Sequence, residues 1–185
     1  MIRLHSELII GSGRDKKCYF HPSDESRCVK ILKSEPSAKK RMLREIKVHK
    51  KIAQQGAKYC YLSSYLCKVE TNLGFGYIFE YIKSFHIKIE DLDADFLKEK
   101  LMDIYRKCYI DALPMCEVRL DNLVLDKNGN FQIVDGLGWA EFIPICYWSK
   151  FFARRKIKRK FTKLINNLEE RTSGWTHSLA SGESS

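Results

Sequence analysis

The most constraining feature of this 185-residue sequence is the order in which short strand-like and long helix-like segments follow one another. The first 82 residues contain five short apolar segments separated by turn formers, and one helical segment, 37–53, that lacks glycine and proline. The rest contains helical segments over 93–110 and 145–170, with the turn-forming pair Asn128-Gly129 between them. This order predicts an α+β fold with two lobes.

The segment lengths set the expected domain limits. We expect a single domain over residues 1–171, with a β-rich lobe over about residues 1–82 and a helical lobe, which carries the hairpin, over about residues 83–171. With 44% hydrophobic residues, a chain of this length can bury a sizeable core. Residues 172–185 are rich in serine and glycine and poor in apolar side chains, which predicts a disordered tail.

The sequence also argues against several classes of protein. It has no run of about 18 apolar residues, so an ordinary membrane-spanning helix is not expected. The first six residues lack the pattern of a secretory signal, so we expect a cytoplasmic protein. We also expect a monomer. The seven cysteines include no C-x-x-C pair and the five histidines lack zinc-ligand spacing, which favours reduced, mostly buried thiols over disulfides or a metal cluster.

The net charge of +10 is concentrated near the C-terminus. Residues 150–163 contain eight lysines or arginines and no acid, and over 148–165 these cations interleave with aromatic and aliphatic side chains. Such a surface predicts an anionic partner. Three interpretations stay open: a packed helix with a solvated basic face, peripheral attachment to an anionic membrane surface at the inner membrane, and nucleic-acid binding. The last is the least favoured because no reading motif is present.

Several polar residues stand at positions that chemistry uses, although each also has an ordinary structural explanation. The turn Gly11-Ser12-Gly13 can serve backbone geometry alone, Lys30 in mid-strand can point to solvent, and Glu45 can be a solvated helix charge. Asn122 and Asp135 bracket the hairpin. An acid directly after an apolar strand and before glycine is a common metal-ligand position and also an ordinary turn, so the order of the whole series carries the argument.

Taken together, the series resembles the protein-kinase signature set. The matching segments, in chain order, are residues 10–13 (glycine-rich loop), Val29-Lys30 (lysine strand), Glu45 (helix glutamate), 79–82 (linker between lobes), 117–125 (catalytic loop and following strand) and 134–138 (metal-binding aspartate).

The chain resembles more closely the PhoP regulatory network YrbL-type family of small bacterial proteins, itself similar to kinases. The resemblance extends from about residue 3 to about residue 165. Its most specific marker is Ile143-Pro144 followed by Trp148-Ser149-Lys150 and a basic helix, which is not a general kinase feature. The resemblance implies a small two-lobed protein-kinase-like fold with a truncated C-terminal lobe.

The resemblance also implies roles in binding ATP and Mg²⁺. Backbone N–H groups of Gly11, Ser12 and Gly13 would approach the phosphates, Lys30 would hold the α- and β-phosphates, and Glu45 would position Lys30.

Four further residues complete the implied site. Glu80, in the linker-like segment, would contact the nucleotide, and Asn122 and Asp135 would ligate Mg²⁺. Glu117 occupies the position of the catalytic aspartate, and Arg119 that of a lysine which touches the transferred phosphoryl group.

The departures from the kinase pattern limit the implied activity. Lys16 stands where the third loop glycine is expected, and Met115-Cys116-Glu117 replaces His-Arg-Asp. Only about 35 residues follow Asp135 before the predicted tail, which leaves no room for a peptide-substrate platform. We therefore expect a phosphotransferase with a small or envelope-associated acceptor, such as a sugar or lipopolysaccharide. The alternative is an inactive pseudokinase that acts as a regulatory or membrane-surface binding module.

Overall fold

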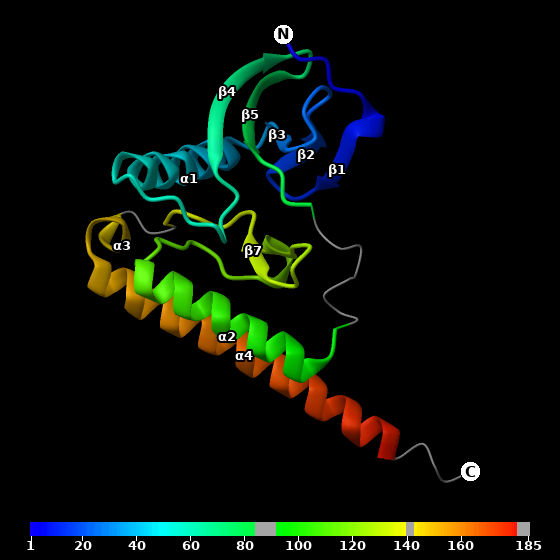
Figure 1. The fold of residues 1–185 in the computed structure, drawn as a ribbon, viewed down its shortest axis with the longest axis vertical. Coiled ribbons are helices and arrows are strands. Elements are labelled where there is room, and N and C mark those ends of the chain that lie inside the picture. The colour runs from blue at the N-terminus through cyan, green and yellow to red at the C-terminus, as the bar shows by residue number, and fades with distance from the viewer. Residues whose placement is uncertain (84–91, 140–142, 181–185) are drawn as a thin grey trace.

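The structure, a computed structural model, describes residues 1–83, 92–139 and 143–180. Its N-terminal part is a five-stranded antiparallel sheet in the order β1-β2-β3-β5-β4 (Figure 1). A short 3-10 helix, Ser6–Leu8, precedes the sheet, and helix α1, Pro36–Gln54, connects β3 to β4. The strands are β1 (Ile9–Ser12), β2 (Lys16–Phe20), β3 (Arg27–Leu32), β4 (Tyr65–Thr71) and β5 (Gly74–Glu80).

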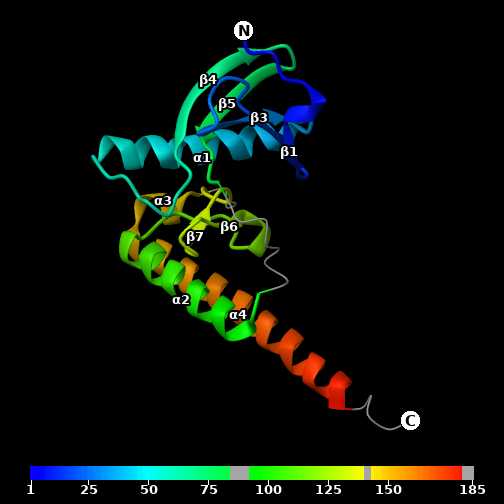
Figure 2. The same ribbon diagram turned by 45° about the vertical axis from the view of Figure 1, so that its right-hand side comes forward.

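The two faces of this sheet bury different sets of side chains because residues alternate along each strand. Val29 and Ile31 of β3 pack with Leu4 on one face, while Cys28 of the same strand packs with Met42 and other residues on the face that α1 covers. Figure 2 shows α1 lying between the sheet and the helices below it. Lys30 lies two residues from Cys28 and therefore faces α1 as well.

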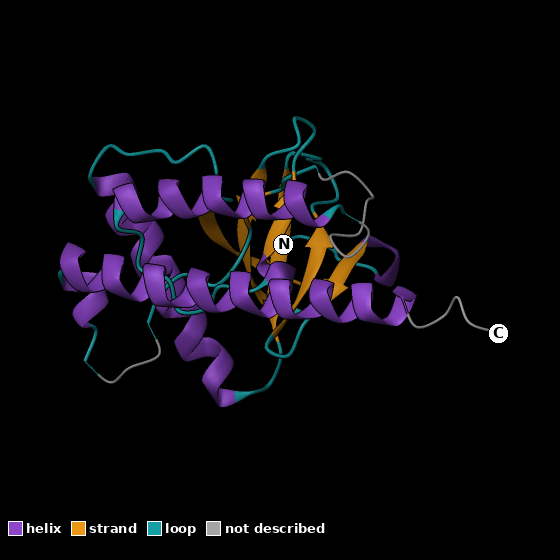
Figure 3. Cartoon of the chain, turned by 90° about the horizontal axis from the view of Figure 1, so that it is seen from below, coloured by secondary structure: helices purple, strands orange, loops and turns teal. Residues whose placement is uncertain are grey.

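The C-terminal part contains two long helices and a hairpin. Helix α2, Ala94–Asp111, is capped by the preceding residue Asp93, whose Oδ1 accepts hydrogen bonds from the N–H groups of Asp95 and Phe96. The 3-10 helix Leu120–Asn122 leads into β6 (Leu123–Leu125), which pairs with β7 (Phe131–Ile133) across the predicted turn. Helices α3 (Ile145–Trp148) and α4 (Lys150–Ala180) follow, and the helices of this part lie in front of the strands when seen from below (Figure 3).

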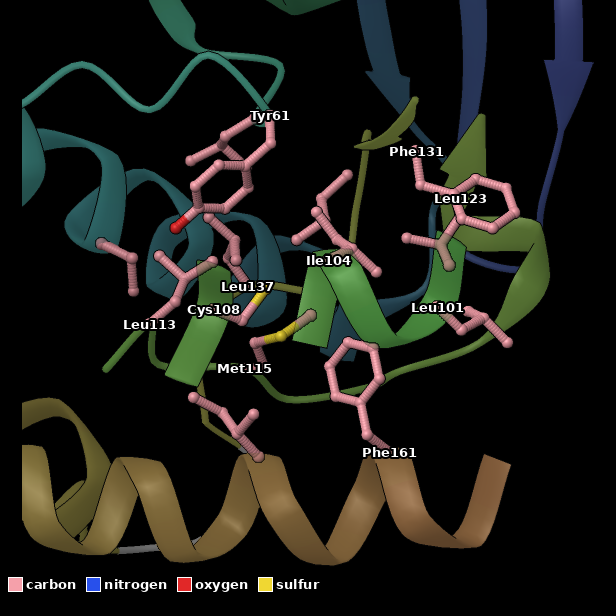
Figure 4. Close-up of a cluster of buried hydrophobic side chains, with 14 of the residues drawn as sticks. Tyr61, Leu101, Ile104, Cys108, Leu113, Met115, Leu123, Phe131, Leu137 and Phe161 are labelled. Carbon is pink, nitrogen blue, oxygen red and sulfur yellow. The ribbon is translucent and has the colours of Figure 1, made fainter. Parts of the chain in front are cut away.

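One apolar cluster holds this part together. Leu101, Ile104 and Cys108 of α2 and Phe161 of α4 are among its buried members, and Figure 4 shows them converging below the hairpin. The same cluster includes Val48 of α1. It therefore joins the two parts of the chain.

Backbone hydrogen bonds also join the β6–β7 hairpin to the segment that precedes β4. The N–H of Ile133 donates to the carbonyl of Tyr61 (2.8 Å), and the N–H of Ser63 donates to the carbonyl of Ile133 (2.9 Å). Because Asp135 follows β7 by two residues, this pairing determines where Asp135 lies relative to α1.

The predicted α+β class is confirmed, and three details differ from expectation. The last helix is divided at Ser149, which is extended (φ −119°, ψ 119°), although the apolar pattern continues across it. Helix α4 continues through residues 172–180, which were predicted to be a disordered tail; this segment contains no proline, and its single glycine costs only about 1 kcal/mol in a helix. Residues 181–185 lie outside the described residues.

The third difference concerns the cysteines. All seven are free thiols, but only Cys28 and Cys108 are buried, and Cys60 and Cys67 are exposed. The expectation of mostly buried thiols is therefore wrong, because the strand segment around Cys67 lies at the exposed edge of the sheet.

Within the described residues, no helix combines the length and the apolar character needed to cross a membrane.

Candidate functional site

A cavity of about 270 Å³ lies where α1, the β1–β2 turn and the segment after β7 meet. Its lining is rich in charged side chains of both signs. Six of the predicted site residues line it: Gly13, Glu45, Glu117, Arg119, Asn122 and Asp135.

Lys30 lies behind this cavity in a buried ion pair. Its Nζ is 3.2 Å from Oε1 of Glu45, and the exposed fractions of the two side chains are only 6% and 5%. The same ammonium donates to the carbonyl of Val134 (2.8 Å) and lies 3.7 Å from the ring centroid of Phe79. The predicted pairing of Lys30 with Glu45 is thus present, between the third strand and the middle of α1.

Burial and neighbouring charges act in opposite directions on Lys30. Burial lowers the pKa of its ammonium, but the carboxylates of Glu45 and Asp135 outweigh burial and raise the pKa above its ordinary value. Lys30 therefore carries a full positive charge at neutral pH.

A second lysine, Lys16, enters the same cluster. Its Nζ is 3.1 Å from Oε2 of Glu45 and 2.7 Å from Oδ1 of Asp135. Each oxygen of the Glu45 carboxylate therefore binds a different lysine. Sequence reasoning treated Lys16 only as a missing glycine, although strand alternation places it on the same face of β2 as Cys18, whose backbone pairs with Lys30.

Asp135 is held in a constrained turn that follows β7. Its Oδ1 accepts the N–H of Gly136 (2.8 Å), and Gly136 has a φ of +96°. A Cβ atom at position 136 would lie 2.6 Å from the carbonyl oxygen of Glu117, so glycine is required there. Burial raises the pKa of Asp135, but Lys30 and Lys16 outweigh it and lower the pKa, so the carboxylate is ionised at neutral pH.

Asn122 and Asp135 provide the oxygen donors that suit Mg²⁺. Both line the cavity, and the carbonyl of Asn122 accepts the N–H of Val134 (3.0 Å), which ties the two segments together. Among the residues that the structure describes, no group of three or more His, Cys, Asp or Glu side chains is placed to hold a metal. One carboxylate and one amide fit Mg²⁺, which normally takes its remaining ligands from water and phosphate.

The segment that carries Glu117 and Arg119 is joined to the site by its backbone. The N–H groups of Cys116 and Glu117 both donate to the carbonyl of Gly136 (2.7 and 3.2 Å). Arg119 donates two hydrogen bonds to Asp121 (2.9 and 2.8 Å), and both side chains are more than 60% exposed. Arg119 thus reaches the cavity wall while paired with an exposed acid.

The β1–β2 turn is anchored to α1 through residues that sequence reasoning missed. Asp15 binds Arg41 through two hydrogen bonds of 2.5 Å, and the Lys33 ammonium donates to the carbonyl of Gly13 (2.5 Å). Gly13 lines the cavity, whereas Gly11 and Ser12 are exposed on β1 and are not among the lining residues.

Glu80 is not brought together with the other predicted site residues. Its carboxylate lies 3.2 Å from Nζ of Lys58 and accepts the N–H of Ser64 (3.3 Å), and it does not line the cavity. The linker-like segment alone could not show that Glu80 pairs with Lys58 and Ser64, because both partners lie outside that segment.

Comparison with known proteins agrees with the family resemblance of the sequence. The family model described as PhoP regulatory network protein YrbL matches residues 2–169. The YrbL proteins of Escherichia coli (strain K12) and Shigella flexneri are each 26% identical to this chain over 182 residues, covering 89% of this chain and 87% of theirs. The chain therefore belongs to the PhoP regulatory network protein YrbL family.

Proposed function

We propose that the cavity binds the phosphates of ATP and that the chain has a small protein-kinase-like fold with a truncated C-terminal lobe. The observation that carries the proposal is the convergence of Lys30 of β3, Glu45 of α1 and Asp135, which follows β7, onto one charge cluster, in which Lys30 and Glu45 are buried and Asp135 is partly exposed. The ammonium groups of Lys30 and Lys16, which lie beside an ionised carboxylate, suit a polyphosphate whose charge must be neutralised.

In this proposal each residue has a distinct role. Lys30, held by Glu45, binds the α- and β-phosphate oxygens. Backbone N–H groups of Gly11, Ser12 and Gly13 contact the phosphates only if the β1–β2 turn moves, because Gly11 and Ser12 do not line the cavity and the N–H of Gly13 donates to the carbonyl of Lys16. Asn122 and Asp135 hold Mg²⁺, which when bound neutralises charge on the phosphates. Glu80 remains a candidate nucleotide contact only if its bonds to Lys58 and Ser64 open.

The proposed acceptor is small or envelope-associated, such as a sugar or a lipopolysaccharide. After Asp135 the described chain forms only α3 and α4, and α4 packs against α2. A platform for a folded protein substrate would need additional elements in this region. Glu117 would accept the proton of the acceptor hydroxyl, and Arg119 would contact the transferred phosphoryl group.

A thermal-shift titration with ATP, with and without Mg²⁺, tests nucleotide binding. A ligand that binds only the folded state raises the unfolding midpoint with its concentration. We expect a shift in the wild type and in Lys17→Met, an exposed neighbour that serves as the matched control, and its loss in Lys30→Met and Asp135→Asn. An equal shift in all four proteins, or none at millimolar ATP, would contradict the proposal.

The alternative, a pseudokinase that binds without turnover, is favoured by the exposed catalytic-loop segment. Glu117 is exposed and Arg119 is engaged by Asp121, so neither is held in a transfer geometry. If Glu117 is a base, Glu117→Gln abolishes phosphate release from ATP and leaves ATP binding intact. Equal turnover in Glu117→Gln would remove the role of Glu117, and no turnover in the wild type would favour the pseudokinase.

A specific observation also supports a membrane-binding function. Phe161 of the basic segment is buried against α2, but Trp148 and Phe151 are 69% and 65% exposed, beside the exposed cations Arg155 and Lys158. Aromatic rings next to lysine and arginine suit the headgroup region of an anionic bilayer. We propose that the start of α4 binds such a surface.

Vesicle co-sedimentation tests this second function. We expect binding to phosphatidylglycerol vesicles, weak binding to phosphatidylcholine, and loss of binding in Arg155→Glu/Lys158→Glu. Arg154 is left unchanged because its guanidinium donates to the carbonyls of Tyr109 and Ile110 and so has a structural role. Lys39→Glu/Lys40→Glu on α1 is the control with the same charge change. Salt-independent binding, or none, would leave a packed helix with a solvated basic face.

A further inference from the structure

The ammonium of Lys16 is paired with Asp135, the carboxylate that would ligate Mg²⁺ in the proposed function. Its Nζ lies 2.7 Å from Oδ1 of Asp135 and 3.1 Å from Oε2 of Glu45, so it bridges both acids of the cluster. We propose that Lys16 is a built-in counter-cation, which occupies Asp135 in the nucleotide-free protein and keeps the affinity of the site for Mg²⁺ low until a polyphosphate draws Lys16 away. The inference rests on the proposed function in treating Asp135 as the metal ligand.

The charge balance of the cluster supports this role. Lys16 and Lys30 contribute two positive charges, and Glu45 and Asp135 contribute two negative charges, so the cluster is neutral without a metal. A divalent cation at Asp135 would add two charges next to an ammonium that is only partly exposed to water. Poor screening in such a place makes the repulsion between the two cations large.

The two lysines differ in their freedom to leave. Lys30 is 6% exposed, and its ammonium is also bound to the carbonyl of Val134 and stacked on Phe79, so it is fixed. Lys16 is 17% exposed, begins strand β2 beside the turn, and lines the cavity itself. Its long, flexible side chain can therefore turn towards an anion in the cavity while its backbone stays in place.

The backbone of Lys16 is anchored, so its position in the cluster is built into the fold. Its carbonyl accepts the N–H of Gly13 (3.0 Å), and the preceding residue, Asp15, is tied to Arg41 of α1. In the β2–β3 ladder Lys16 pairs with Leu32, which makes it a diagonal neighbour of Lys30 on the same face. A phosphate that reaches Lys16 would therefore also be near Lys30, and the freed Asp135 oxygen would become available to the metal.

Metal binding without nucleotide tests this inference directly. The probe is Mn²⁺ alone, followed by electron paramagnetic resonance of the free ion and competed with Mg²⁺. We expect Lys16→Met to bind Mn²⁺ at least tenfold more tightly than the wild type. Lys16→Arg, which keeps the cation, and Lys17→Met, which removes an exposed neighbouring charge, should match the wild type. Lys16→Met binding no more tightly than Lys17→Met would overturn the inference.

Two further measurements separate the possible failures. Circular dichroism shows whether each variant is folded; if Lys16→Met is not, Lys16→Gln, which keeps a hydrogen-bond donor, takes its place with the same expected result. ATP binding in EDTA should weaken about tenfold in Lys16→Met, because Lys16 then no longer meets the phosphates. If the wild type binds no ATP under any condition, the proposed function fails, while the Mn²⁺ result still decides the role of Lys16 at Asp135.

Discussion

The buried charge cluster and the catalytic-loop segment lie on the same cavity but are built differently. In the cluster, Lys30 and Glu45 are at most 6% exposed. Strands β2 and β3 and helix α1 hold the paired charges in place. In the loop segment, Arg119 and Asp121 are both more than 60% exposed and pair with each other. Under the proposed function, this difference would correspond to a preformed site for phosphates beside a group-transfer site that the fold does not preform.

The largest expected effect is on the cluster, through Lys30→Met. Removing Lys30 leaves the two carboxylates of Glu45 and Asp135 with the single ammonium of Lys16, so one negative charge of the cluster is no longer compensated. Breaking a buried ion pair in this way typically costs about 3–5 kcal/mol. We expect the free energy of unfolding in urea to fall by about this amount. Adding Glu45→Gln should recover part of the loss, because the second change removes the excess negative charge and leaves Lys16 paired with Asp135. A loss below about 1 kcal/mol in Lys30→Met would mean that the cluster is solvated and no different from the loop.

A smaller effect, on pH dependence, involves His49, which packs edge-to-face on Phe79 behind the cluster. Burial and the charges of Lys30 and Lys16 lower the pKa of His49 to about 3. Below its ordinary pKa of about 6.5 the unfolded chain therefore takes up a proton that the folded chain refuses, and stability falls as the pH falls.

We expect the free energy of unfolding to drop by about 2 kcal/mol between pH 7 and pH 5 in the wild type, and by much less in His49→Gln. Carboxylates with lowered pKa values, such as Asp135, lose their contribution mainly below this range, so the window isolates the histidine. Urea unfolding at several pH values measures both slopes. Equal slopes would show that His49 takes up a proton in the folded protein.

The smallest effect is expected at the loop. Arg119→Ala removes an exposed ion pair with Asp121, and such pairs contribute about 0–1 kcal/mol. The free energy of unfolding should change by less than about 0.5 kcal/mol, and the remaining difference should vanish in high salt. A loss comparable with that of Lys30→Met would show that the loop segment is as firmly built as the cluster.

Local patterns in the sequence predicted much of the fold. A short apolar segment bounded by turn formers placed the third strand near its observed limits, the Gly- and Pro-free segment predicted α1, and the Asn128-Gly129 pair predicted the β6–β7 turn. The break at Ser149 was missed because the apolar pattern continues through it. The extension of α4 to Ala180 was missed because composition alone was used for the last residues.

The candidate site was predicted only in part, because its contacts join residues far apart in the chain. The motif order identified Lys30, Glu45 and Asp135, but no local pattern shows that Lys16 meets Asp135, 119 residues away. The partners of Glu80 were missed for the same reason. Charged side chains choose their partners through tertiary packing, and a single sequence records such packing only weakly.

The central claim is that phosphates bind at the Lys16–Lys30 cluster, and phosphorus NMR of ATP tests it most directly. We expect the α- and β-phosphate resonances to shift and broaden when wild-type protein or Lys17→Met is added, and to stay unchanged when Lys30→Met is added. Unchanged phosphate resonances with folded wild-type protein at millimolar ATP, or equal changes with Lys30→Met, would contradict the account.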